Sequence, residues 1–133
     1  MEKYTKKLEY DKVINILSGY CNTYIGKELC YKLQPSFNFN EVTKLLSQTD
    51  EACLLLVKKG NLPLNSIPNI SNYLKLLDSG LILSIKGLLD IARLLKISRE
   101  LKNYFFSDKE SINDEYKLLY NYFDNLYSNQ SIE

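Results

Sequence analysis

Histidine is absent from this sequence of 133 residues, and its absence removes most of the usual catalytic chemistry. Histidine is the commonest general base, the usual partner of a nucleophilic serine or cysteine, and the commonest metal ligand. Two carboxylate pairs remain, Asp50 with Glu51 and Asp114 with Glu115. Sequence neighbours point about 100° apart on a helix, which is typical of a solvated face rather than of a shared proton or metal. We therefore predict no catalytic, cofactor-binding or metal-binding residue in this chain.

An excess of charge of one sign is also missing. Seventeen Lys and Arg residues face sixteen Asp and Glu residues, which gives a formal net charge of +1. A nucleic-acid binder uses a basic excess to neutralise phosphates and to release counterions. Any contact that this chain alone makes with nucleic acid should therefore be weak.

Cysteines are few and long apolar runs are lacking. Cys21, Cys30 and Cys53 are odd in number and show no C-x-x-C spacing. This favours buried free thiols in a reducing cytosol, with a structural disulfide as the alternative. The longest strictly apolar run covers only residues 54–57, so we predict no signal peptide and no membrane span. We expect a cytoplasmic protein that does not enter a membrane.

Proline and glycine are scarce, and no proline follows Pro68. Long helices are unobstructed there, and apolar residues throughout recur at spacings of three and four rather than two. The 45% hydrophobic and 25% charged fractions are close to globular averages. The sequence predicts one all-α domain over residues 1–133, a multi-helix bundle with helices near 5–20, 23–33, 40–59, 69–79, 84–107 and 111–128.

Local signals place several ends of these helices. Thr5 is the candidate N-cap of the first helix, Asn38 or Asn40 of the third, and Ser84 of the longest. Pro35 should stop the second helix, Gly60 the third and Gly80 the fourth, and residues 60–68 should form a surface crossing. The predicted core-facing stripe of the third helix is Val42, Leu45, Leu46, Thr49, Ala52, Cys53, Leu56 and Val57. That of the longest helix is Leu88, Ile91, Ala92, Leu94, Leu95, Leu101 and Phe105, wide enough to pack on two sides.

The last stripe is rich in aromatic residues. Side chains this large and regular either face a partner surface or close the bundle of the chain itself, and the pattern leaves both interpretations open. Its members are Ile112, Tyr116, Leu119, Tyr120, Phe123, Leu126 and Tyr127.

Two motifs resemble known functional signals but lack essential residues. Gly26-Lys27 resembles the end of a phosphate-binding loop, yet the upstream glycine and the following Ser or Thr are missing, so close approach of another helix better explains the glycine. Residues 89–105 have the rhythm of a DNA-reading helix-turn-helix with Ala92 at the helix contact. Lys96 stands where the turn needs a glycine, so one continuous helix with a Lys96–Glu100 surface pair is favoured.

Taken together, the residues resemble the N-terminal region of the Smr-bearing bacterial branch of the MutS family, of the endonuclease and recombination-suppressor type. The resemblance covers nearly the whole chain and depends on the order and spacing of its pieces. These are Leu8-Glu9-Tyr10-Asp11-Lys12-Val13, Gly26-Lys27-Glu28-Leu29, Leu33-Gln34-Pro35-Ser36, Thr49-Asp50-Glu51-Ala52, Leu62-Pro63, Ile67-Pro68-Asn69-Ile70 and Gly80-Leu81-Ile82-Leu83-Ser84.

The resemblance implies a dimeric, ATP-dependent DNA-binding parent with a helical core and clamp, a P-loop ATPase domain that uses ATP and Mg, and an Smr nuclease domain. Such proteins are associated with suppression of homologous recombination through branched DNA and, in some bacteria, with stalled or collided ribosomes. This chain has no Walker motif and no Smr segment. It would be the first part of the helical core, with the remaining core, clamp and ATPase domains as its partners, and would transmit nucleotide-driven movement.

Two other functions compete with this one. The chain could be a freestanding helical adaptor that binds a protein through the Tyr-rich face of residues 116–127, since aromatics are enriched at interfaces. It could also be a helix-turn-helix DNA binder, whose affinity would fall steeply with salt. A P-loop downstream in the reading frame would favour the core segment, and a stop codon near Glu133 the adaptor.

Overall fold

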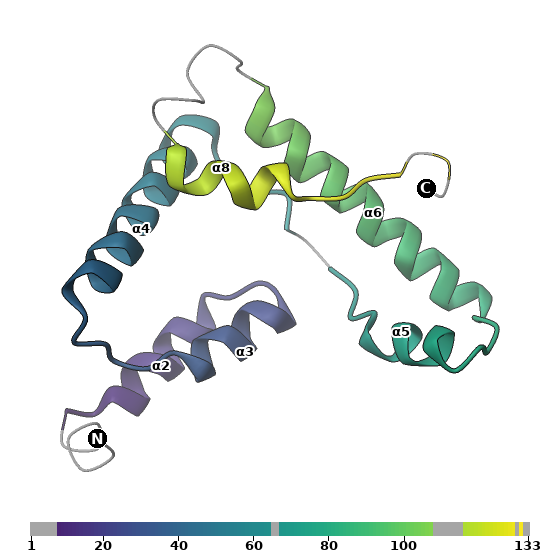
Figure 1. The fold of residues 1–133 in the computed structure, drawn as a ribbon, viewed down its shortest axis with the longest axis horizontal. Coiled ribbons are helices and arrows are strands. Elements are labelled where there is room, and N and C mark those ends of the chain that lie inside the picture. Colours follow the sequence, from purple (N-terminus) through teal and green to yellow (C-terminus); the bar gives the residue numbers. More distant parts are fainter. Residues whose placement is uncertain (1–7, 65–66, 108–115, 130, 132–133) are drawn as a thin grey trace. The chain divides into compact units, whose positions relative to one another are not determined.

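The computed structural model describes residues 8–64, 67–107, 116–129 and 131. Within these ranges every regular element is a helix and no strand occurs, which confirms the predicted all-α class. Figure 1 shows the order of the elements along the chain. The described helices are α2 (Tyr10–Gly19), α3 (Tyr24–Lys32), α4 (Phe39–Lys59), α5 (Ser71–Asp78), α6 (Ile85–Phe106) and α8 (Lys117–Asp124).

The chain separates into two compact units, Met1–Pro35 and Ser36–Glu133. We describe each unit by itself. A single domain over residues 1–133 stays a prediction.

The first unit is a hairpin of α2 and α3, held largely by polar contacts. The Tyr10 hydroxyl donates to the Leu33 carbonyl over 3.1 Å, and the hydroxyls of Ser18 and Tyr31 are 3.2 Å apart. Ile14 is the buried apolar side chain of α2. α3 ends at Lys32, because the next residues adopt the extended backbone that precedes Pro35. The predicted stop at this proline is confirmed.

The first helix begins later than predicted. Residues 8 and 9 form a turn, and Glu9 has a φ of 54°, in the left-handed region that a helix cannot include. The Glu9 carboxylate is paired with the Lys12 ammonium over 2.7 Å, a contact that a predicted start at residue 5 does not anticipate. The predicted cap Thr5 lies outside the described residues.

Most of the other predicted helix ends are confirmed. The Asn38 side chain accepts from the Glu41 amide over 3.2 Å, which decides between the two candidate caps of α4, and the Ser84 hydroxyl accepts from the Gly87 amide over 3.3 Å. Gly60 and Gly80 end α4 and α5 with φ of 77° and 72°, values that favour glycine. α5 starts two residues later than predicted, within the usual uncertainty of helix ends.

The last helix is much shorter than the predicted 111–128. Residues 111–115 lie outside the described residues, and Tyr116 at the start has a non-helical φ of −127°. α8 ends at Asp124, because side chains of α6 donate hydrogen bonds to the backbone carbonyls of residues 124–127. Lys102 donates to the Asp124 carbonyl over 2.9 Å, and the Ser98 hydroxyl donates to the Tyr127 carbonyl. Side-chain contacts with another helix thus replace the final helical turn that the sequence predicted.

α5 packs against the beginning of α6 through a close contact at Gly87. A Cβ added at Gly87 would lie 3.3 Å from the Tyr73 ring, and the Tyr73 hydroxyl donates to the Asp90 carboxylate over 2.9 Å. This hydrogen bond, together with burial and the Asp90 charge, raises the pKa of Tyr73. α6 therefore contacts α5 near its beginning and α8 near its end. Gly87 and Phe105 lie on the same side of α6 at 100° per residue, so these two contacts do not test the predicted packing on two sides.

The Tyr73–Asp90 hydrogen bond predicts how stability changes at alkaline pH. Because the pKa of Tyr73 is raised in the folded state, the stabilisation is complete below the ordinary tyrosine pKa of about 10 and is lost as pH rises through the raised value. Tyr73→Phe should flatten the alkaline decline of the urea midpoint between about pH 9 and pH 11. Exposed Tyr20 offers the matched control, Tyr20→Phe, which should keep the wild-type slope. Equal slopes in Tyr73→Phe and wild type would contradict the assignment.

Candidate functional site

The centre of the second unit is an aromatic cluster where α4, α6 and α8 meet, and we call it the junction. Leu55, Phe105 and Tyr116 are 2%, 0% and 2% exposed. The rings of Phe105 and Phe123 stack with centroids 4.2 Å apart. Partly buried residues packed against the three are Tyr104, Phe106, Leu119, Tyr120 and Phe123.

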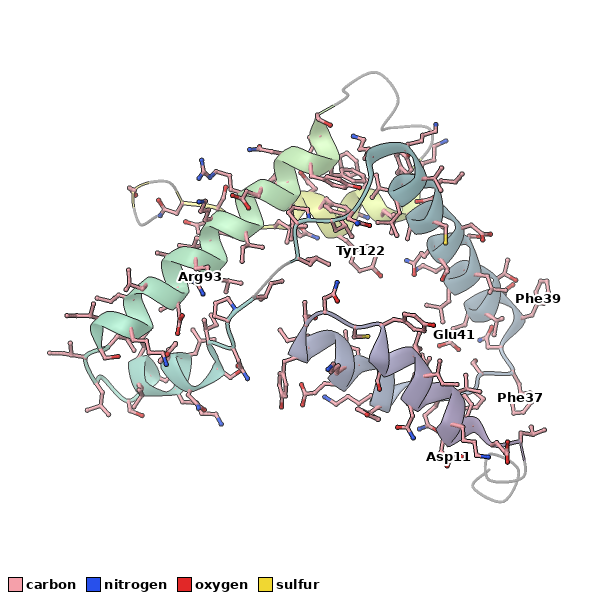
Figure 2. The ribbon with its side chains drawn as sticks, turned by 180° about the vertical axis from the view of Figure 1, so that it is seen from behind. Asp11, Phe37, Phe39, Glu41, Arg93 and Tyr122 are labelled. Carbon is pink, nitrogen blue, oxygen red and sulfur yellow. The ribbon has the colours of Figure 1, made fainter. Side chains whose placement is uncertain are left out.

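The junction decides between the two interpretations of the last stripe. Tyr116, Leu119, Tyr120 and Phe123 all belong to the cluster, so this face of α8 is chiefly internal and the partner-facing interpretation is wrong for it. Figure 2 labels Tyr122, which is 62% exposed and accepts a hydrogen bond from the Gln48 amide over 3.3 Å. Predicted member Ile112 lies outside the described residues.

Glu51 of α4 caps the beginning of α8. Its carboxylate accepts from the backbone amides of Leu118 and Leu119, both at 3.0 Å. These amides belong to the first turn of α8, whose amides have no partners within the helix, and the positive end of the helix dipole favours a carboxylate. The own N-cap residue of α8, Tyr116, makes no side-chain cap bond. The expectation of a solvated face for Glu51 is therefore wrong, while Asp50 is exposed as predicted and Asp114 and Glu115 lie outside the described residues.

Lys59, two turns further along α4, binds the end of α6. Its ammonium donates to the Phe105 carbonyl over 2.8 Å, to the Tyr104 carbonyl over 3.3 Å and to the Ser107 hydroxyl over 3.1 Å. A cation at the carbonyl end of a helix complements its dipole. The contact is reciprocal, since the Tyr104 hydroxyl donates to the Gly60 carbonyl at the end of α4 over 2.6 Å. α4 thus supplies an anion to one neighbouring helix and a cation to the other.

The cap that Glu51 provides should be measurable as stability. Glu51→Ala leaves two amides of α8 without their charged acceptor, and we expect a loss of about 1–3 kcal/mol in the free energy of unfolding. Adjacent Asp50 gives the matched control, because Asp50→Ala removes an exposed carboxylate from the same helix and should change stability by less than about 0.5 kcal/mol. Urea unfolding measures both. Similar losses in the two variants would show that the carboxylate–amide contacts contribute nothing specific.

Part of the apolar stripe predicted to bury α4 lies on the side of the helix opposite Leu55. At 100° per residue, Leu46, Cys53 and Val57 are about 160–200° around the axis from Leu55. Leu46 is 61% exposed, Val57 is 82% exposed and Cys53 is exposed. We call these three residues the outer stripe. The prediction that α4 buries this side is therefore wrong for these three residues, because the contacts of Glu51, Leu55 and Lys59 turn the other side to the junction. Val42 and Ala52 of the same predicted stripe are half-buried.

Other large apolar side chains of the second unit are exposed as well. Ile85, Leu88 and Leu89 in the first turns of α6 are 78%, 56% and 65% exposed. Figure 2 shows Phe37 and Phe39 projecting from the chain at the beginning of α4, and they are 87% and 80% exposed. Large contiguous apolar patches are typical of protein interaction surfaces. We take the outer stripe as the candidate functional site, an apolar face for interaction.

The two motif resemblances do not lead to further sites. α6 runs unbroken through Lys96, which lies 4.0 Å from the Glu100 carboxylate, so the helix-turn-helix interpretation is wrong and the predicted surface pair is confirmed. Gly26 lies in the first turn of α3. A Cβ there would be 2.9 Å from the Thr23 hydroxyl and 3.6 Å from Cys21 Cβ, so the glycine accommodates its own loop and not, as predicted, a neighbouring helix.

The described residues show neither a membrane-spanning helix nor a metal-ligand cluster. None of their helices is long and apolar enough to cross a bilayer. They contain no group of three or more Cys, Asp or Glu residues that could hold a metal ion.

Sequence comparison supplies a family for this set of helices. The chain is 38% identical over 104 residues to "Endonuclease MutS2" of Alkaliphilus metalliredigens, an alignment that covers 78% of the chain and 13% of that protein. It is 39% identical over 107 residues to the Endonuclease MutS2 of Ligilactobacillus salivarius, covering 80% and 14%. A third, from Halothermothrix orenii, is 34% identical over 113 residues, covering 85% and 14%. The chain is a partial MutS2 region.

The comparison also sets the scale of the match. The chain spans about one seventh of the length of the curated MutS2 relatives that it matches. The family that the sequence resembles is thereby confirmed. No protein-family model matches the chain, and no solved structure matches it.

Proposed function

We propose that this chain is a non-catalytic helical core segment of a larger MutS2 protein, situated at its N-terminus. Its function is to pack against the remaining core, clamp and ATPase domains of the same chain and to transmit nucleotide-driven movement between them. The outer stripe carries this proposal, because it is an apolar helix face opposite a side that is already occupied. A helix with one side in a junction and an apolar opposite side suits a position between two layers.

The chemistry of the parent belongs to its other parts in this proposal. ATP and Mg bind in the ATPase domain, DNA is cleaved in the Smr domain, and this chain holds no cofactor. The parent acts as a cytoplasmic homodimer on branched DNA, suppresses homologous recombination, and in some bacteria acts on stalled ribosomes. The name of the relatives, Endonuclease MutS2, supports the nuclease assignment for those proteins. The net charge of +1 fits a segment that leaves nucleic acid to other domains.

The adaptor function has less support. Its binding face was the aromatic side of α8, and Tyr116 and its packed neighbours occupy the junction instead. A separate partner would have to bind elsewhere.

Cys53 offers a direct test, because it is a thiol on the outer stripe. In the full-length parent, neighbouring domains should cover the stripe and slow alkylation of Cys53 at least about tenfold relative to the isolated chain, since a buried thiol reacts slowly. Nucleotide addition should change that rate if the stripe lies at a moving interface. Equal alkylation rates in the parent and in the isolated chain would refute the packing on which the proposal depends.

Substitution of the stripe tests the same face by affinity. Val57→Lys places a charge in the proposed interface and should weaken binding of the chain to the rest of the parent, added as a separate polypeptide, at least about tenfold. Asn40→Lys is the matched control, since Asn40 is also exposed on α4 but lies about 100° around the helix axis from Val57. Isothermal titration calorimetry measures both, and equal affinities would remove Val57 from the interface.

A further inference from the structure

The loop between α2 and α3 brings two thiols into contact. Cys21 follows the end of α2, Cys30 lies in the last turn of α3, and their Sγ atoms are 3.2 Å apart. Both side chains are half-buried, so small thiol reagents can reach them. The third cysteine, Cys53, is exposed and belongs to the other unit.

Several contacts hold the two thiols in this position. The Thr23 hydroxyl accepts from the Gly26 amide over 3.0 Å and caps α3, which fixes the turn between the cysteines. Gly26 leaves space for this turn, because a Cβ there would lie 2.9 Å from the Thr23 hydroxyl and would also contact Cys21. On the other side of the pair, the Ser18–Tyr31 contact holds α2 against α3.

We propose that Cys21 and Cys30 are a reversible redox pair, which forms an intramolecular disulfide that links the end of α2 to α3. A disulfide has an S–S distance of about 2.05 Å, so the two sulfurs, 3.2 Å apart, need to approach by only about 1 Å. The contact that Cys21 makes with the Leu17 carbonyl, at 3.7 Å, involves a weak sulfhydryl donor and is easily given up.

The oxidant is a low-molecular-weight disulfide such as oxidised glutathione. The thiolate of one cysteine attacks a glutathione sulfur, forms a mixed disulfide and releases one glutathione thiolate. The second cysteine then loses its proton, attacks the protein sulfur of the mixed disulfide and releases the second glutathione. The two protein thiols are oxidised, one glutathione disulfide is reduced to two thiols, and the two protons pass through solvent to those thiols.

The environment of Cys30 sets the pH at which this exchange is fast. Its hydrogen bond with Cys21, together with burial and the charge of a neighbouring thiolate, raises the pKa of Cys30. Because the thiolate is the attacking species, exchange should accelerate toward alkaline pH.

The consequence is a hairpin whose stability depends on the thiol redox state. The link closes a short loop and removes conformations from the unfolded hairpin. For a loop of this size the unfolding equilibrium constant of the hairpin should fall by about tenfold to a hundredfold. Reduction by excess thiol restores the original value.

Peptide mapping tests the link directly. Trypsin cleaves after Lys12, Lys27 and Lys32, so Cys21 lies in peptide 13–27 and Cys30 in peptide 28–32. The Cys53→Ser chain, which keeps only the proposed pair, is equilibrated with glutathione buffers, alkylated and digested. We expect the two peptides joined by a disulfide, in a product that excess dithiothreitol abolishes. The equilibrium constant for disulfide formation should be at least about tenfold larger in buffer than in roughly 8 M urea, which is enough to unfold small domains.

Two single variants serve as controls. Cys21→Ser and Cys30→Ser, each in the Cys53→Ser background, should give only glutathione adducts and no joined peptides. If native Cys53→Ser yields separate peptides with glutathione adducts, the proposal is refuted. An equilibrium constant no larger in buffer than in urea also refutes it, because the fold then would not hold the thiols together.

Discussion

The Glu51 carboxylate accepts hydrogen bonds from the first-turn amides of α8, and the arrangement of the second unit depends on this contact. α8 has no side-chain cap of its own, so its beginning is stabilised by a residue of another helix. The same side of α4 carries Leu55 into the aromatic cluster and Lys59 to the carbonyl end of α6. One side of α4 thus carries an anion, an apolar contact and a cation in succession. The anion Glu51 lies at the amide end of α8 and the cation Lys59 at the carbonyl end of α6, so each charge complements the dipole of the helix that it contacts.

This use of α4 explains why so much apolar surface remains exposed. The side of the helix with the charged residues is the side that faces its neighbours, and the side with Leu46 and Val57 is left outside. A domain that is complete by itself buries its most apolar helix face first. In the proposed core segment, another part of the parent covers that face. The similarity to part of MutS2 proteins about six times as long as the chain agrees with this explanation.

The first unit is built differently. Ile14 and Ser18 are the buried residues of α2, α3 buries none, and the two helices are joined by hydroxyl, carbonyl and thiol contacts. Polar contacts between half-buried groups contribute little net stability each, so a hairpin of this kind responds strongly to any additional link. The pair of thiols lies at the loop end of the hairpin, where such a link constrains both helices.

The sequence by itself determined the helical class and most helix ends, because these depend on residues a few positions apart. Asn38, Ser84, Gly60 and Gly80 act on their own turns, and Lys96 with no glycine beside it predicted the unbroken α6. Only the tertiary structure decided which side of α4 is inside and where α8 ends. Apolar periodicity identifies a face but not its partner, and 67 positions separate Glu51 from Leu118. The sequence predicted a solvated Glu51 because burial of a carboxylate is favourable when it gains hydrogen-bond partners, and here those partners are amides distant in the sequence. No local pattern indicates such a contact.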